Sequence, residues 1–151
     1  MPLIDLTMPA GALDDETRGA LVQRLGSTLL RWEGAPDTEF FQSIMWVHVH
    51  ELPAQAVNAA GAPVTEPHFR VDVTVPDGAL SERRKEGAVK ELTEAVMEAA
   101  GLDESAGLRV WVIVREVPEG NWGAGGQVVR FSQLRETAQR ERERVAAPAG
   151  D

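Results

Sequence analysis

The chain contains one pattern twice, and this internal repeat limits the folds that it can adopt. Matching residues lie 67 positions apart in the first part of the pattern and 65 apart in the second, which a two-residue deletion explains. The matched pairs include Asp5 and Asp72, Thr7 and Thr74, Trp46 and Trp111, Glu51 and Glu116, and Pro53 and Pro118. So many matches in one register indicate two copies of one structural unit, at residues 2–53 and 69–131.

Each copy predicts a strand, a helix and a second strand. The first strand alternates apolar and polar residues, which is typical of a half-buried strand. In the helix of the first copy, Leu21, Leu25 and Leu29 share one face. Gly34 follows this helix as a stop signal. The expected elements are strands at 3–8, 41–50, 69–75 and 109–116, and helices at 14–32 and 81–100. The apolar run at 110–114 predicts a strand buried on both faces.

A β-α-β unit of this length joins two parallel strands by a right-handed helical crossover. Two units predict an α+β fold with a four-stranded sheet and two helices on one face. The other face then needs a cover, so we expect an oligomer. We expect residues 1–151 to form one domain, with a linker at 54–68 and a charged tail at 132–151 whose last residues, 146–151, are frayed.

The composition excludes several classes of function. The net charge is −9 and the isoelectric point is near 4.8, which argues against nucleic acid and anionic membranes as partners. The chain has no cysteine, so disulfides and thiolate chemistry are absent. Neither a signal peptide nor a long apolar run is present. These features predict a cytoplasmic protein.

Proline follows the initiator methionine. Removal of Met1 would leave Pro2 with a free secondary amine. None of the twenty amino-acid side chains provides a base of this kind. Burial disfavours the cationic form of an amine and lowers its pKa. A base whose pKa lies near the working pH is what proton abstraction requires. Pro2 is therefore a candidate catalytic residue.

Together, Pro2, the β-α-β duplication and the segment 116–126, in which Trp122 lies among glycines, resemble the tautomerase superfamily in its fused, two-unit form. The likeness covers residues 2 to about 131, and 116–126 is similar to the tail of 4-oxalocrotonate tautomerase units. The resemblance implies removal of Met1, a catalytic amino-terminal proline and a homotrimer. It implies one active site per chain, because Phe69 stands where the second unit would need a proline.

A narrower resemblance is to malonate semialdehyde decarboxylase. Its acidic and polar positions correspond to Glu39 and Gln42 here, although Phe40 replaces a usually basic residue. The resemblance implies that Glu39 is the carboxylate near Pro2, that Gln42 is a polar neighbour, and that Trp122 is either an apolar wall of the site or an interface residue.

The arginines that usually bind a substrate carboxylate in this family are missing. Their positions fall at Ala12, at 76–80, and at Trp46 and Trp111. Arg70 is the candidate replacement, with Arg115 and Arg130 as weaker ones. Without the usual arginines, a dianionic substrate is disfavoured.

These residues predict a cofactor-independent isomerase that moves a proton in a small 2-oxo acid or enol. One alternative is a decarboxylase, hydratase or dehalogenase of a small 3-oxo or unsaturated acid, and another is a non-catalytic subunit or binding module. A third is an enzyme for a bulky aromatic substrate. His48 and His50 point the same way from one strand. No third ligand lies near them in the sequence, so we expect sheet-edge or interface histidines and no metal.

Overall fold

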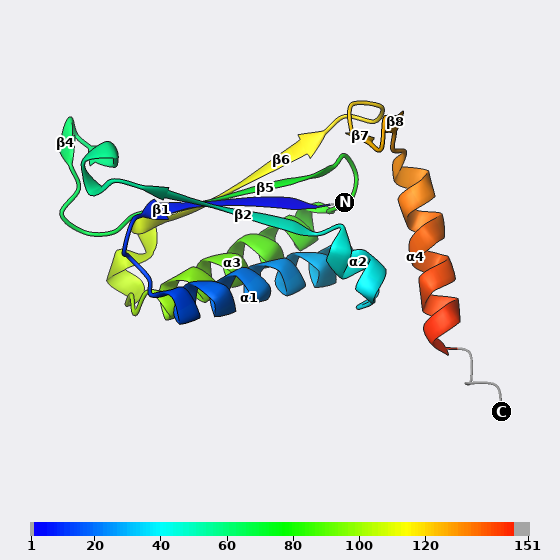
Figure 1. Ribbon diagram of the computed structural model, residues 1–151, viewed down its shortest axis with the longest axis horizontal. Coiled ribbons are helices and arrows are strands. Elements are labelled where there is room, and N and C mark those ends of the chain that lie inside the picture. Colours follow the sequence, from blue (N-terminus) through cyan, green and yellow to red (C-terminus); the bar gives the residue numbers. More distant parts are fainter. Residues whose placement is uncertain (1, 147–151) are drawn as a thin grey trace.

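The computed structural model describes residues 2–146. Its main sheet has the strand order β2-β1-β5-β6, and helices α1 (Asp15–Glu33) and α3 (Glu82–Ala99) cover one face (Figure 1). The strands are β1 (Leu3–Pro9), β2 (Trp46–Leu52), β5 (Phe69–Pro76) and β6 (Val110–Val117). β1 runs parallel to β2, β5 runs parallel to β6, and the central pair β1–β5 is antiparallel. The predicted four-stranded sheet with two helices on one face is confirmed.

Both long helices begin and end where the sequence predicts. The side chain of Asp14 caps α1 by accepting a hydrogen bond of 2.7 Å from the backbone N–H of Thr17. Gly34 ends α1 in the left-handed region, with φ of 72°, and its N–H donates to the carbonyl of Arg31.

The core lies between the helices and one face of the sheet. Alternate residues of the central strands and one stripe of each helix are fully buried there. They include Ile4, Leu6, Met8, Val71, Val73, Val75, Leu25, Leu29, Leu92 and Val96. Burial of one such side chain contributes roughly 1.5–3 kcal/mol relative to its exposure. The core therefore fixes the pleat of β1 and β5, and with it the residues on the open face.

Helices α1 and α3 lie side by side and antiparallel. Ion pairs join Arg31 to Glu91 and Arg24 to Glu98 across their exposed edges. Next to the Arg31–Glu91 pair, the ring of Trp32 lies against Gly87. A Cβ atom added at Gly87 would be 2.2 Å from Cη2 of Trp32, so only glycine permits this approach.

We expect Gly87→Ala to destabilise the fold. Displacing the indole costs about 1–3 kcal/mol, more than the roughly 1 kcal/mol that alanine gains over glycine in a helix. Gly19→Ala is the matched control, because a Cβ atom at Gly19 of α1 meets nothing within 4 Å. Thermal unfolding should show a lower Tm for Gly87→Ala and an equal or higher Tm for Gly19→Ala. A higher Tm for both Gly87→Ala and Gly19→Ala would contradict the close packing of Trp32 against Gly87.

The start of the predicted strand at 41–50 is wrong. Residues Glu39–Ser43 form a short helix, α2, and the strand begins only at Trp46. Thr38 starts the helix, since its hydroxyl accepts a hydrogen bond of 3.5 Å from the N–H of Phe41. Phe41 is buried with Leu30 and Ala138. Phe41 is the one buried residue of this five-residue helix. The segment therefore has no repeating pattern of apolar residues from which a helix could be predicted.

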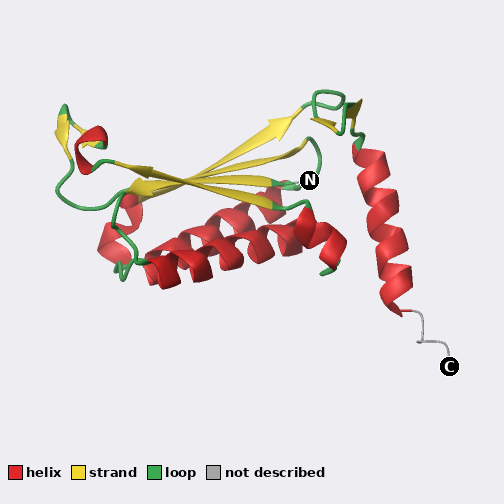
Figure 2. Cartoon of the chain, viewed as in Figure 1, coloured by secondary structure: helices red, strands yellow, loops and turns green. Residues whose placement is uncertain are grey.

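The prediction that β6 is buried on both faces is also wrong for the single chain. Val112 and Val114 pack against the core, but Trp111 is 63% exposed. Trp46 of β2 is 61% exposed. β2 and β6 are the outer strands, and no element of residues 2–146 covers the face of the sheet opposite to the helices (Figure 2).

The connecting segments contain small elements that the sequence did not predict. The linker holds a 3-10 turn, η1 (Ala54–Ala56), and a hairpin of β3 (Asn58–Ala59) with β4 (Ala62–Pro63). A second 3-10 segment, η2 (Glu104–Arg109), precedes β6. The glycine-rich segment forms the hairpin of β7 (Gly123–Ala124) with β8 (Gln127–Val128).

The charged tail is largely the helix α4 (Phe131–Ala146). The predicted removal of Met1 lies outside the described residues, and so does the predicted fraying at 146–151 except at Ala146, which is the last residue of α4. Among the helices of residues 2–146, none combines the length and the apolar character that crossing a membrane requires.

Candidate functional site

Pro2 lies at the end of the sheet where β1 and β2 begin. Its ring is fully buried, and its carbonyl accepts a hydrogen bond of 3.3 Å from the N–H of Trp46. β5 ends here and α1 ends nearby (Figure 1). The first residue of the repeat thus lies in a region of low dielectric constant.

A cleft of about 800 Å³ opens at the same end of the molecule. Its walls come from the end of α1, the β5–α3 turn, the start of α3, and α4. The lining includes Glu33, Gly34, Phe41, Gly78, Arg84, Phe131 and Arg142. It combines apolar surface with a few charged groups, as small-molecule sites do.

Glu33 is the titratable group of this cleft with the most altered environment. Burial raises the pKa of the Glu33 carboxyl from 4.5 to about 7, and the positive charge of the amino terminus opposes this rise in part. Desolvation is the dominant cause, since it disfavours the charged form of a carboxyl. A carboxyl of this pKa can donate or accept a proton near neutral pH.

Two arginines approach the backbone beside Glu33 from different helices. Nη1 of Arg84, on α3, lies 3.5 Å from the carbonyl oxygen of Glu33, and the guanidinium of Arg142, on α4, donates to the carbonyl oxygen of Gly34. Arg135 also lines the cleft. The cleft therefore holds positive charge that the repeat alignment did not reveal.

The structure places the other predicted site residues away from this cleft. Glu39 is the exposed first residue of α2, and the amide of Gln42 donates to Asp37 at 2.7 Å. Arg70 lies on the open face of the sheet, 2.6 Å from Asp72. Trp122 is partly buried before β7. Within residues 2–146, the cleft lining includes none of these four side chains, and it does not include Pro2 either.

Glu33 escaped the sequence analysis, although a signal was present. It is the last residue of α1, immediately before the stop at Gly34. A carboxylate is unfavourable at the C-terminal end of a helix, where the dipole is negative. A glutamate at this position indicates a carboxyl with an altered pKa. It lies at the end of the sheet where the amino-terminal strand begins.

The geometry defines a duplicated α+β protein with a cleft at the end of the sheet where the buried Pro2 lies. Residues 67–132 match the family described as Tautomerase enzyme. The match covers the second unit rather than the unit that carries Pro2. No curated protein matches the chain.

Solved structures match over nearly the whole chain. One is N1, a member of the cis-3-chloroacrylic acid dehalogenase family, at 22% identity and a TM-score of 0.74, covering 95% of this chain and 98% of that one. Another is Pt0534 inactivated by 2-oxo-3-pentynoate, at 23% identity and 0.71, covering 87% and 98%. A fused 4-OT wild-type asymmetric trimer matches at 19% identity and 0.71, with the same coverage.

The resemblance predicted from the sequence is confirmed. The chain has the fold of the tautomerase superfamily in its fused, two-unit form, and its second unit carries the sequence pattern of the tautomerase family.

Proposed function

We propose that this protein is a cofactor-independent isomerase in which the amine of Pro2 moves a proton within a small 2-oxo acid or its enol. The observation that carries the proposal is that the buried Pro2 lies at the same end of the sheet as a cleft lined by Glu33, whose carboxyl pKa burial raises to about 7. A base and an acid with different environments at one cleft match the requirement of proton transfer between two carbons.

In this mechanism, the neutral ring nitrogen of Pro2 takes a proton from the carbon next to the substrate carbonyl. The electron pair of the broken C–H bond moves toward the carbonyl oxygen and gives an enolate. The protonated carboxyl of Glu33 stabilises that oxygen by donating a hydrogen bond. The proline cation then returns the proton to another carbon of the substrate, and the amine is free again.

Arg84 is the proposed contact for the substrate carboxylate. Its guanidinium makes one long contact with the backbone of Glu33 and is exposed at the mouth of the cleft. A planar guanidinium can bind a carboxylate with two parallel hydrogen bonds. Glu39, Gln42, Arg70 and Trp122 stay as sequence-based proposals for the same substrate.

A second candidate function is hydration or dehalogenation of a small unsaturated acid. The dehalogenase-family structure covers 95% of this chain, more than the fused 4-OT structure does. Here Pro2 acts as the cation and protonates the double bond, and Glu33 as the carboxylate activates water. The two functions need opposite protonation states of Pro2, so the pH dependence of the rate distinguishes them.

A homotrimer is the assembly that we propose for either function. The sheet face opposite to the helices has no cover within residues 2–146, and Trp46 and Trp111 lie exposed on the two outer strands. Burial of such aromatic surface is a usual feature of subunit interfaces. Structures of this fold include symmetric and asymmetric fused 4-OT trimers.

The test of the proposed function is covalent labelling with 2-oxo-3-pentynoate, the compound that inactivates Pt0534. A neutral amine at Pro2 should add to the alkyne carbon of this electrophile. We expect the amino-terminal peptide, beginning at Pro2, to gain the mass of one inhibitor molecule. The chain has no cysteine, so amines and the three imidazoles are the groups that compete for the reagent.

Lys85 provides the internal control for this labelling. Its ammonium lies 2.8 Å from Glu116, and the hydrogen bonds to Glu116 and Glu82 raise its pKa. The Lys85 peptide should therefore stay unmodified while the Pro2 peptide is labelled. Retention of Met1 in the intact mass, or label on lysines only, would remove the proline mechanism and favour the non-catalytic binding module.

A further inference from the structure

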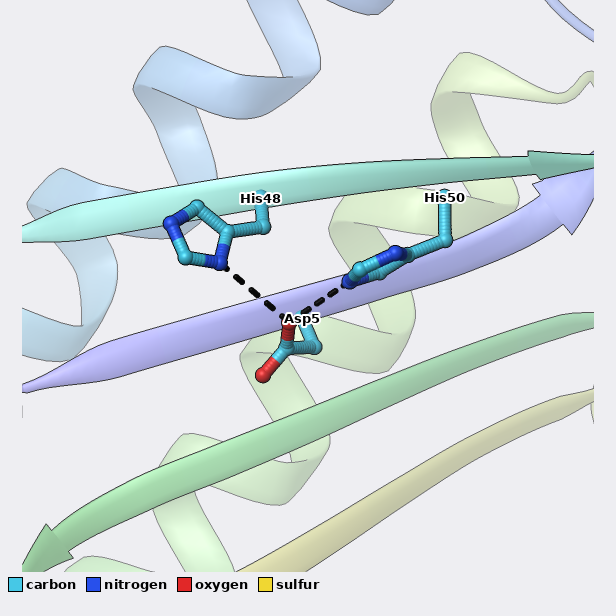
Figure 3. Close-up of side chains that lie close together, drawn as sticks. All are labelled: Asp5, His48 and His50. Carbon is cyan, nitrogen blue, oxygen red and sulfur yellow. Dashed lines mark hydrogen bonds and ion pairs between the residues drawn. The ribbon is translucent and has the colours of Figure 1, made fainter.

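Asp5, His48 and His50 form a cluster on the open face of the sheet, away from the cleft (Figure 3). The register pairs Asp5 of β1 with His48 of β2, and His50 lies two residues further along β2. Nε2 of His50 is 2.6 Å from Oδ1 of Asp5, and Nδ1 of His48 is 3.5 Å from the same oxygen. One atom from each residue lies within 4.8 Å of the others.

The second copy of the repeat shows what is unusual about this cluster. Asp72 is the equivalent of Asp5, and the two are direct neighbours across β1 and β5. Two arginines satisfy Asp72: Nε of Arg70 at 2.6 Å and Nη2 of Arg115 at 2.9 Å. Arg115 is the repeat equivalent of His50. The same position therefore carries a permanent cation in one unit and an imidazole in the other.

This difference changes what can bind the carboxylate. Arginine has no acceptor and never coordinates a metal, whereas neutral imidazole is the commonest metal ligand in proteins. Within residues 2–146, the two histidines are the only basic side chains within 4 Å of the Asp5 carboxylate. A dication at this point would supply the positive charge that Arg70 and Arg115 supply to Asp72.

The distances fit a tetrahedral metal centre. Metal–nitrogen and metal–oxygen bonds near 2.0–2.1 Å put neighbouring ligand atoms about 3.3 Å apart. The observed separations of 2.6 and 3.5 Å from Oδ1 of Asp5 lie on either side of this value. The ligand atoms of the two histidines lie within 4.8 Å of each other, so side-chain rotations on the paired strands must bring them to the same separation.

We propose that Asp5, His48 and His50 form a binding site for Zn²⁺, with water as the fourth ligand. Two imidazoles and one carboxylate suit zinc, whereas magnesium and calcium prefer oxygen ligands alone. Both imidazoles are about half exposed in the single chain, so the fourth position is open to water, or to a group of a neighbouring subunit in the proposed trimer. The structure supplies the third ligand that the sequence did not reveal.

The experiment is calorimetric titration of chelator-treated full-length protein with ZnCl₂. We expect saturable binding of one zinc ion per chain, and the intense visible absorbance of tetrahedral Co²⁺, which is blue, when Co²⁺ replaces zinc. His48→Gln and His50→Gln should each weaken binding by about tenfold or more, because each removes a direct ligand. Zinc should also raise the Tm of the wild type in proportion to the logarithm of its concentration.

His68→Gln is the matched control, because His68 lies outside the cluster and its Nδ1 contacts the carbonyl of Glu66 at 2.8 Å. It should bind zinc as the wild type does. Asp5→Asn tests the carboxylate if either histidine variant fails to fold. Equal affinity in His48→Gln, His50→Gln and His68→Gln, or no saturable binding by the wild type, would overturn the proposal. Labelling at Pro2 by 2-oxo-3-pentynoate should be the same in all three variants, so this test is independent of the proposed isomerase.

Discussion

Pro2→Ala should lower the kcat/KM for ketonisation of a simple enol by about 100-fold or more. The substitution replaces a rigid secondary amine by a flexible primary amine at the same place. The ring of Pro2 is fully buried, which holds this residue in one orientation. Alanine keeps a base at the amino terminus but loses that orientation, which is the larger part of the advantage of a positioned base.

The measurement is the rate of disappearance of enol absorbance with the enols of pyruvate and phenylpyruvate. Pro53→Ala is the matched control, because Pro53 is exposed at the end of the first unit. Intact mass should confirm that Met1 has been removed from both variants, and size-exclusion chromatography that both keep the wild-type assembly. A Pro2→Ala protein as fast as the wild type would remove the isomerase, whereas a preference for the phenyl compound would favour the aromatic-substrate alternative.

The repeat carried most of the fold prediction, for a physical reason. Side chains alternate along a strand, so the alternation in β1 and β5 determines which residues face the helices. Ile4 and Leu6 must then face the core, and Asp5 the open side. Crossover handedness leaves few arrangements for two β-α-β units. The strand order and the helical layer follow from these constraints.

The candidate site depended on distances that no local pattern contains. Glu33 and Arg84 come from different copies of the repeat, at the end of one helix and the start of the other. They meet because the central strands are antiparallel, which places these two helix ends together. The resemblance to a known family suggested Glu39 as the carboxylate of the site instead. In the structure, Glu39 lies on the short helix α2, which depends on the burial of one ring, that of Phe41.

The same limit explains the missed third ligand of the zinc site. Asp5 and His48 are 43 positions apart in the sequence, and only the parallel register of β1 with β2 makes them neighbours. The repeat alignment already paired Asp5 with Asp72 and His50 with Arg115. What it lacked was the direction of each side chain across the strands.

Glu33→Gln should change both the pH dependence of stability and that of catalysis. The pKa of Glu33 is about 7 in the fold, against 4.5 in its ordinary state. The folded chain therefore holds this proton more tightly than the unfolded chain does. Its stabilising effect is complete below pH 4.5 and is lost as the pH rises to about 7. The glutamine variant has no such loss.

We expect wild type and Glu33→Gln to have equal free energies of unfolding near pH 4, where both side chains are neutral. Near pH 8 the variant should be more stable by about 1–2 kcal/mol. The difference between the two pKa values corresponds to roughly 3 kcal/mol in the free energy of unfolding. Because the Glu33 side chain is partly exposed, we expect a smaller difference than this. Urea unfolding at both pH values measures the difference. A variant that is less stable at pH 8 would show that the ionised carboxylate is favourably held.

Catalysis by Glu33→Gln should fall by about 100-fold at pH 6, because the variant lacks the acidic proton that stabilises the enolate. The decline of kcat/KM above pH 7 that we expect for the wild type should disappear with it. Glu39→Gln makes the comparison decisive, since Glu39 is the carboxylate that the sequence resemblance implies and it lies exposed on α2. If Glu33→Gln stays active while Glu39→Gln does not, the resemblance identified the acid correctly and the cleft carboxyl is not part of the mechanism.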